Sequence, residues 1–249
     1  MTEAKRHDPN PLAVGAKETA GTVISALLIA LVIRVGLGQP YTIPSESMEP
    51  GLLVGDYILV SKFDYGWSRW SIPLGPPLFH GRVLAREPSR GDVVVFAKPG
   101  DEHTTMIKRL IGVPGDRVQV RGGVLYRNDR PVARTPDGEM EDPGDPGLLV
   151  ARSRESVAGY VTLNRGEGYP GDDTEVFSVP AGHYFFMGDN RDNSADSRFP
   201  QGVGVGLVPA ENLIGKARWR VLSWQPGASL LKPWTWLNLR GGRAFQAVR

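Results

Sequence analysis

Residues 20–37 are the feature that most limits how this chain folds. The stretch AGTVISALLIALVIRVGL holds 18 residues and one charge, Arg34, near its far end. As a helix it would span about 27 Å, close to the ~30 Å hydrocarbon core of a bilayer. Nearly all-round hydrophobicity argues against a core helix, and Gly36-Leu37-Gly38 is a poor site for removal of a signal peptide. We therefore predict one transmembrane helix, with signal peptide and core helix as the alternatives.

The basic residues around this stretch predict its orientation. Lys5, Arg6 and Lys17 precede it, and no basic residue lies between Leu37 and Asp56. Because cytoplasmic flanks carry the excess of Lys and Arg, residues 1–19 are expected in the cytoplasm and residues 38–249 outside. The chain is thus predicted to be a single-pass protein of the cell membrane with an extracytoplasmic domain.

The rest of the chain is typical of an all-β domain. With 31 Gly and 21 Pro among 249 residues, short apolar runs alternate with turn residues. No helical period of 10–15 residues separates the runs, so antiparallel sheets are expected. The strands are predicted at 54–60, 92–96, 106–111, 117–120, 124–126 and 184–187.

Three regions are harder to interpret. Residues 127–180 are predicted to be an inserted cap, within which the acidic stretch 135–147 is expected to be a solvated loop. The aromatic, Pro-rich segment 67–80, with Trp67 and Trp70, is expected either to touch lipid or to fold over its own core. The same choice stays open for the Trp-rich C-terminus, 219–249.

Composition and missing motifs exclude several chemistries. The absence of cysteine excludes disulfides, thiolate zinc sites and a cysteine nucleophile, and a net charge of +2 gives no reason to expect nucleic-acid binding. There is no G-x-S-x-G, H-E-x-x-H or phosphate-loop motif. We expect neither a metal nor a cofactor.

Three other segments carry the residues that suggest chemistry. In the first, Ser45 and Ser47 lie in a turn stiffened by Pro44 and Pro50, where hydroxyls are held in fixed directions. In the second, 106–116, the predicted strand 106–111 places Lys108 on one face between two apolar neighbours, where its amine is expected to be desolvated. The third, 187–198, is a polar turn rich in donors and acceptors.

These segments resemble the signature boxes of bacterial type I signal peptidases, membrane-bound Ser-Lys proteases that remove signal peptides from exported proteins. Residues 44–50 match P-S-x-S-M-x-P, residues 107–116 match I-K-R followed by G-x-P-G-D, and residues 188–198 match G-D-N-R-D-N-S-x-D-S-R. The order of the boxes and the preceding anchor also agree. Two departures are Glu46, where the family commonly has Gly, and Met106, where an aromatic residue is frequent.

The resemblance implies a role for each matching residue. Ser47 would be the nucleophile and Lys108 the general base, with the Ser47 N–H and the Ser45 hydroxyl as the oxyanion hole. Ser194 would orient the lysine amine. The remaining support would come from the ion pair of Asp196 and Arg198, and from a turn shaped by Gly188 and Asn193.

A lysine base makes a physical demand on its surroundings. With an ordinary pKa of about 10.4, only about 0.04% of lysine is neutral at pH 7, whereas a useful base needs a pKa near 7–8. Burial supplies such a shift of about three units. We therefore expect Lys108 to be desolvated beside the hydroxyls of Ser47 and Ser194.

The resemblance also implies the substrate. Such enzymes cleave secretory preproteins after a small-x-small sequence, so the pocket beside Ser47 is expected to be shallow and apolar, with Ile43 and Ile107 as its walls. Membrane phospholipid is the second expected partner. Two alternatives stay open: a self-cleaving Ser-Lys regulator of the LexA type, which shares the dyad and a related β core, and an inactive membrane-anchored β scaffold that binds exported peptides.

Overall fold

The computed structural model describes residues 11–142, 145–225, 227–228 and 232–248. One long helix leads into a β domain of three antiparallel sheets. The prediction of an all-β, antiparallel domain after one N-terminal helix is therefore confirmed.

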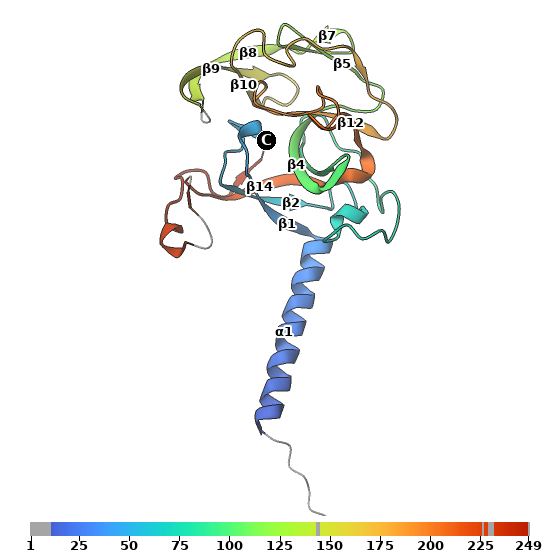
Figure 1. Ribbon diagram of the computed structural model, residues 1–249, viewed down its shortest axis with the longest axis vertical. Coiled ribbons are helices and arrows are strands. Elements are labelled where there is room, and N and C mark those ends of the chain that lie inside the picture. Colours follow the sequence, from blue (N-terminus) through green and yellow to red (C-terminus); the bar gives the residue numbers. More distant parts are fainter. Residues whose placement is uncertain (1–10, 143–144, 226, 229–231, 249) are drawn as a thin grey trace, which may run out of the picture.

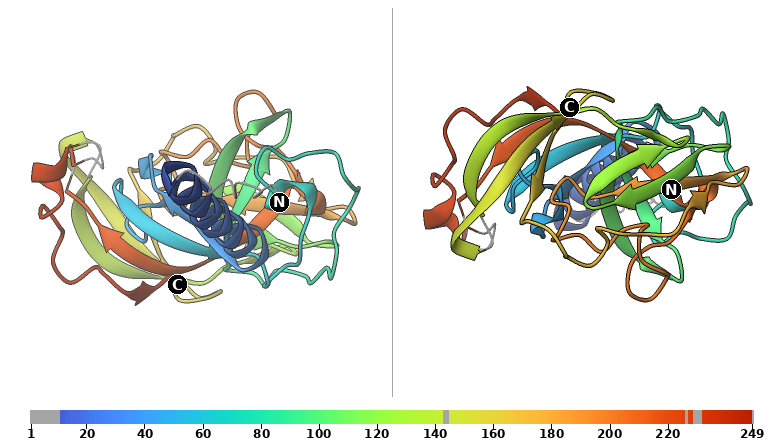
Figure 2. Two further views of the ribbon diagram at one scale, coloured as in Figure 1. Left: turned by 90° about the horizontal axis from the view of Figure 1, so that it is seen from below. Right: turned by 90° about the horizontal axis from the view of Figure 1, so that it is seen from above.

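The helix α1 (Pro11–Gly36) contains the predicted membrane segment. It projects away from the β domain (Figure 1), and its stretch Thr19–Gly36 is apolar enough to cross a membrane and is exposed as far as Arg34. Seen from below, α1 lies beneath the middle of the β domain (Figure 2). The first ten residues of the predicted cytoplasmic tail, 1–10, lie outside the described residues, and the helix already includes 11–19.

The largest sheet has eight described strands and holds parts of the three boxes found in the sequence. Its strand β14 lies between β2 and β3, and β15 pairs with β14 off this path. In spatial order the sheet comprises β1 (Gly38–Thr42), β2 (Asp56–Ser61), β14 (Leu213–Ser223), β3 (Val93–Lys98), β4 (Asp101–Gly112), β12 (His183–Met187) and β13 (Val208–Pro209), with β15 (Gln246–Ala247) beside β14.

Two edges of this sheet remain unpaired next to the first two boxes. Among the described residues, strand β1 pairs only with β2, and β12 pairs with β4 only from Arg109 to Gly112. The first half of β4 therefore has a free edge. Although β1 and β4 are far apart in strand order, Tyr41 and Thr105 line one cavity, and Ile43 and Ile107 share one core cluster. The sheet thus curls until its free edges face a common space.

The two smaller sheets form the end of the domain opposite α1 (Figure 1). One has the order β10-β9-β8 and the other the order β11-β5-β6-β7. Their strands are β5 (Arg117–Arg121), β6 (Val124–Arg127), β7 (Arg130–Pro131), β8 (Arg134–Asp142), β9 (Asp145–Glu155), β10 (Val161–Asn164) and β11 (Phe177–Ser178). The predicted cap, 127–180, therefore shares its second sheet with the preceding hairpin of β5 and β6.

Short 3-10 helices occupy the connections between the strands. The first of them contains Ser47 and links β1 to β2. They are η1 (Glu46–Met48), η2 (Arg69–Ser71), η3 (Ala210–Asn212) and η4 (Pro233–Thr235).

The prediction of a solvated loop at 135–147 is wrong. Strands β8 and β9 pair along this stretch as a long antiparallel hairpin, from Arg134 opposite Glu155 to Asp142 opposite Asp145. The acidic residues are exposed along much of β8, but Asp142 is buried and pairs with Arg165 at 2.6 Å. Pairing of the backbone with β9 therefore overrides the turn-forming composition of the segment.

The six predicted strands are all present, with ends shifted by a few residues and β4 extended back to Asp101. Strand β14 was not predicted from the sequence. Its Lys216, Arg218 and Arg220 occupy alternate positions, with Ala217, Trp219 and Val221 between them, and β2 and β3 pair with it on both sides. Lys216 and Arg218 pair with Asp92 and Asp64, which lets a basic strand run through the sheet.

Candidate active site

The nucleophile candidate lies in a turn that the neighbouring strands hold in place. Ser47 is 7% exposed in η1, whereas Ser45 just before it is exposed. The turn is fixed by backbone bonds from the Ile43 N–H to the Asp56 carbonyl and from the Gly55 N–H to the Ile43 carbonyl. The two serine hydroxyl oxygens are 3.4 Å apart. Both hydroxyls thus belong to one rigid turn beside the sheet.

Strand β4 brings Lys108 to this turn across 61 positions of sequence. Its Nζ donates a hydrogen bond of 2.6 Å to the Ser47 Oγ, and the side chain is only 2% exposed. Lys108 lies opposite Val94 on β3, a strand whose run of valines is buried on both faces. The structure therefore brings the two central site candidates together in a water-poor environment.

This environment changes the acidity of the amine. Burial is the largest cause that lowers the pKa of Lys108, to about 8, while the carboxylates of Asp196 and Asp189 partly oppose it. A substantial fraction of the amine is therefore neutral near pH 8, as a general base requires.

The third box braces the turn from behind. The Asn190 N–H donates to the Ser47 carbonyl at 3.2 Å, and the Gly188 N–H donates to Asp196 at 3.0 Å. A side chain at Gly188 would lie 2.5 Å from the Ser47 carbonyl oxygen, so only glycine permits this approach. Asp196 forms the ion pair with Arg198 at 2.9 Å that the sequence led us to expect, fully out of solvent.

Asn193 and Ser194, two further residues of the third box, make contacts that the sequence analysis did not predict. Asn193 reaches across to the nucleophile turn, where its Nδ2 donates to the Glu46 carboxylate at 2.9 Å. Glu46, the departure from the family's usual Gly, is therefore tied to the third box. The hydrogen bond predicted between Ser194 and Lys108 is not formed, because the buried Ser194 Oγ has no partner among the described residues. That hydroxyl instead faces Gly188, where an added Cβ would approach it to 2.3 Å.

Comparison with known proteins identifies the family. The family model described as "Signal peptidase, peptidase S26" matches residues 16–224 of the chain. The chain belongs to this signal peptidase family. A signal peptidase I of Rickettsia typhi is 39% identical over 245 residues, which cover 88% of this chain and 89% of that protein. One from Rickettsia felis is 41% identical over 219 residues, which cover 84% of this chain and 80% of that one.

A solved signal peptidase I from Enterococcus faecalis V583 is 27% identical and covers 53% of this chain and 97% of its own, with a TM-score of 0.33. Membership of the signal peptidase family makes the chain a membrane-anchored serine endopeptidase that acts on the signal peptides of secretory preproteins. It also decides against the LexA-type regulator and the inactive scaffold.

A buried charged network behind the signal peptidase site was missed by the sequence analysis. Arg109, next to Lys108, donates two bonds of 2.6 Å to Asp189. Arg191 pairs with Glu155 at 2.5 Å, and the Tyr160 hydroxyl donates to Glu155 at 2.6 Å. The two arginines and Asp189 lie inside the second and third boxes. The pair of Arg109 with Asp189 could therefore have been predicted by matching opposite charges between the boxes. Glu155 and Tyr160 belong to the cap, where no motif pointed to them.

Glu49 is the second group that sequence reasoning missed. It is 2% exposed, and its Oε2 has no hydrogen-bond partner among the described residues. Burial and the nearby Glu46 carboxylate raise the pKa of Glu49 to about 7. A second group thus titrates near neutrality two residues from Ser47, so a pH profile must separate it from Lys108.

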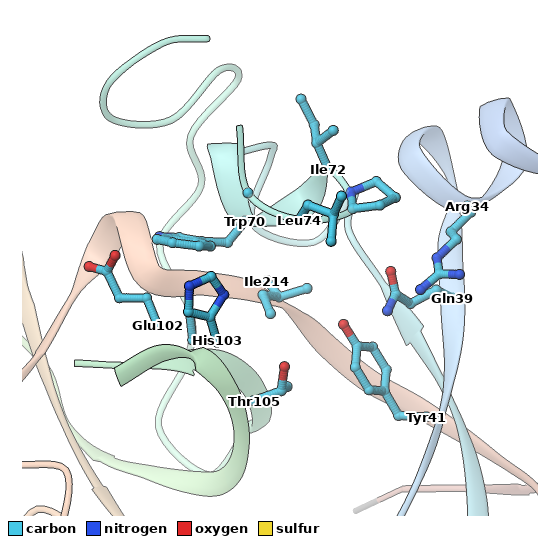
Figure 3. A pocket seen from close by; sticks show the side chains of 13 residues that line it. Arg34, Gln39, Tyr41, Trp70, Ile72, Leu74, Glu102, His103, Thr105 and Ile214 are labelled. Carbon is cyan, nitrogen blue, oxygen red and sulfur yellow. The ribbon is translucent and has the colours of Figure 1, made fainter. Parts of the chain in front are cut away.

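The predicted pocket walls lie within the core. Ile43 is 2% and Ile107 is 9% exposed, and both pack in one cluster with Met48, beneath the nucleophile turn. A cavity of about 280 Å³ opens nearer the membrane helix, where Tyr41 and Thr105 face each other across it (Figure 3). Neither isoleucine lines that cavity. The apolar cluster and the cavity thus follow one another along the free edges of β1 and β4.

Proposed function

We propose that this enzyme cleaves N-terminal signal peptides after a small-x-small sequence, with Ser47 as nucleophile and Lys108 as general base. The observation that carries the proposal is the 2.6 Å hydrogen bond between the buried Lys108 amine and the Ser47 hydroxyl. A hydroxyl is a weak nucleophile and needs a base within this reach.

Acylation follows from this contact. In the structure the Lys108 Nζ donates to the Ser47 Oγ; once the amine is neutral, the direction of this bond reverses and the Ser47 hydroxyl gives its proton to the amine. The Ser47 Oγ then attacks the carbonyl carbon of the scissile peptide bond, which gives a tetrahedral oxyanion. The ammonium of Lys108 returns the proton to the departing amine nitrogen. The C–N bond breaks, the mature protein leaves, and the signal peptide stays as an ester on Ser47.

Deacylation uses the same base. Neutral Lys108 takes a proton from an incoming water, and the hydroxide attacks the ester carbon. The Ser47 Oγ leaves and recovers its proton from the ammonium, which frees the signal peptide as a carboxylic acid. Both half-reactions require the amine to be unprotonated at the start, so the pKa of about 8 is central to the rate.

The oxyanion would be stabilised from within the nucleophile turn. Within the described residues the Ser47 N–H donates to no backbone carbonyl of a turn, and the exposed Ser45 hydroxyl lies 3.4 Å from the Ser47 Oγ. Two donors near the nucleophile fit the geometry of an oxyanion hole. A single such donor contributes about 3–4 kcal/mol to the transition state.

The substrate would bind as an added strand. The unpaired edges of β1 and β4 offer backbone donors and acceptors to an extended peptide beside Ser47. The cluster with Ile43 and Ile107 lies directly beneath, and its close packing leaves depth only for small side chains. Along a strand, alternate side chains point to the same face. The two small residues of the small-x-small sequence would therefore point toward the cluster, and the residue between them would point away and be unrestricted.

Orientation and lipid contact complete the proposal. Lys5, Arg6 and Lys17, which precede the apolar stretch 20–37, favour a cytoplasmic N-terminus with the dyad outside. Near the outer end of α1, Leu74, Leu78 and Leu84 are 95%, 71% and 71% exposed, so this edge is suited to the phospholipid surface. Trp67 and Trp70 are only half exposed and turn partly inward.

The proposal is tested by incubating a secretory preprotein with the enzyme and with three variants. S47A and K108A are expected to leave the preprotein intact, because each removes one half of the dyad. S89A, at an exposed serine outside the site, is the matched control and should cleave normally. Cleavage by S47A at the rate of the unaltered enzyme would refute the assignment.

A further inference from the structure

The outer end of α1 is attached to the β domain by side chains that the proposed chemistry does not use. The last carbonyls of any helix lack intrahelical partners. Here the Lys62 Nζ donates to the Arg34 carbonyl at 2.6 Å, and the Trp67 indole N–H donates to the Val35 carbonyl at 2.9 Å. The Lys62 backbone N–H also donates to the Leu37 carbonyl at 3.2 Å. Three bonds, to the carbonyls of Arg34, Val35 and Leu37, thus join the helix end to the segment after β2.

Lys62 is an unusual residue for such a place. Its side chain is fully buried, and it also donates to the Ser71 carbonyl at the end of η2. Burial, together with the nearby Arg34 guanidinium, lowers the pKa of Lys62 to about 8. At neutral pH the amine is therefore mostly charged and faces the negative end of the α1 dipole. A buried lysine that binds only peptide carbonyls has a structural task.

The two carbonyls that Lys62 joins belong to two sides of one cavity. Arg34 and Gln39 stand on one side, and Trp70, Ile72 and Leu74 stand on the other (Figure 3). Lys62 connects these sides from behind, because it binds the backbone of Arg34 and of Ser71, which lies between Trp70 and Ile72. The end of α1 is thus integrated into the domain.

We propose that Lys62 and Trp67 are positioning residues that lock the membrane helix to the catalytic domain at one angle, and so set the height of Ser47 above the bilayer. This inference rests on the proposed function. A preprotein held in the membrane offers its cleavage site at a limited reach, since an extended chain advances only about 3.3–3.6 Å per residue. A domain that swings on its anchor would meet that site less often, whereas a soluble peptide would reach the dyad at any angle.

The test compares two substrates with one cleavage sequence, using full-length enzyme in vesicles of phosphatidylethanolamine and phosphatidylglycerol. One substrate is a preprotein inserted in the same vesicles, and the other is a soluble peptide. For K62M, we expect kcat/KM to fall about tenfold on the inserted preprotein and to stay within about twofold on the peptide, because loss of buried donors loosens the joint. W67F, which removes one donor and keeps a ring, should show a loss of about threefold on the preprotein alone.

Matched controls are K98M and W219F, which change a lysine and a tryptophan outside the joint and should leave both rates unchanged. An equal loss on both substrates would overturn the inference, as would no loss on either. If K62M fails to fold, W67F and K62R carry the test. Because the soluble-peptide rate reports on Ser47 and Lys108 directly, failure of the dyad is seen separately from failure of the joint.

A second measurement follows the angle itself. The chain has no cysteine, so spin labels attach only where cysteine is introduced, at Val32 on α1 and at Leu149 on β9, both exposed. We expect one narrow distance distribution for the enzyme in vesicles and a broad one for K62M. Unchanged distributions in K62M and W67F would overturn the inference.

Discussion

The regions around Lys108 and Lys62 differ in what their buried lysines bind. Both side chains are almost fully buried, and burial lowers the pKa of each to about 8. Lys108 donates to a serine hydroxyl, whereas Lys62 donates to two peptide carbonyls. A hydroxyl can give up a proton to the neutral amine, and a carbonyl can only accept. A lowered pKa therefore does not identify a catalytic lysine, and the partner atom does.

The largest test of this difference replaces each lysine by arginine. Arginine keeps a cation and its donors but does not deprotonate in proteins. K108R should lower kcat/KM on a soluble peptide by about a thousandfold or more, whereas K62R should stay within about threefold. Steady-state cleavage of one peptide by both variants makes the comparison. Comparable activity of the two variants would remove the distinction drawn between the lysines.

Stability gives the next test, with opposite effects expected. An amine whose pKa is lowered by folding binds fewer protons folded than unfolded. The free-energy cost of burying the charged Lys108 amine is full below pH 8. It disappears as the pH rises from about 8 to 10.5, the ordinary pKa of lysine. K108M should therefore raise the free energy of unfolding at pH 7 by as much as about 3 kcal/mol, and less as pH approaches 10.5.

K62M also removes the cost of a buried charge, but this gain in stability is offset. Two buried carbonyls lose their donor, which costs about 1–3 kcal/mol for each of them. We expect no gain in stability at pH 7. Denaturant titration of both variants in one detergent, at pH 7 and pH 10, measures the difference. Destabilisation by K108M would show that its charge is not costly in the folded state.

A third comparison concerns the serines beside the two lysines. S45A removes a proposed oxyanion donor and should lower kcat about a hundredfold with little change in KM. S71A should leave peptide cleavage unchanged, because Lys62 binds the backbone carbonyl of Ser71 and the variant retains it. Initial rates across substrate concentrations separate kcat from KM. A loss that lies entirely in KM would assign Ser45 to substrate binding.

The smallest expected effect is in the pH profile. Since only neutral Lys108 acts as base, kcat/KM should rise about tenfold from pH 6 to pH 7 and level off above a pKa of about 8. Glu49 titrates near pH 7, so E49Q is the variant that separates the two groups. The limb near pH 8 should persist in E49Q and in K62R. If this limb disappeared in E49Q, the titration near pH 8 would be assigned to the carboxyl group of Glu49 and not to Lys108.

Local pattern predicted much of the sheet and failed where partners are distant. The run of valines in β3 is recognisable because both of its faces are buried. The acidic hairpin of β8 and β9 and the basic strand β14 were not recognisable from the sequence. Their charges are balanced by residues that lie far away in the chain. Arg165 balances Asp142, and Asp64 balances Arg218.

The candidate site divides in the same way. The boxes were found from the order of residues, and the family resemblance that they carry implied Ser47, Lys108 and the pair of Asp196 with Arg198. The sequence did not reveal that the Ser194 hydroxyl has no partner within the described part of the chain, or that Glu155 of the cap holds Arg191. Such contacts depend on side-chain directions within about an ångström, which strand packing determines.

By itself, the sequence determined that the chain has one membrane-length apolar segment, a turn-rich β domain after it, and the serine and lysine needed for an acyl transfer. Only the tertiary structure decided that residues 61 positions apart meet at 2.6 Å, and that water is removed from one end of the lysine while the hydroxyl remains within reach. Residue type supplies a group with an ordinary pKa. Burial by distant strands changes that pKa, because the cost of a charge depends on everything packed around it.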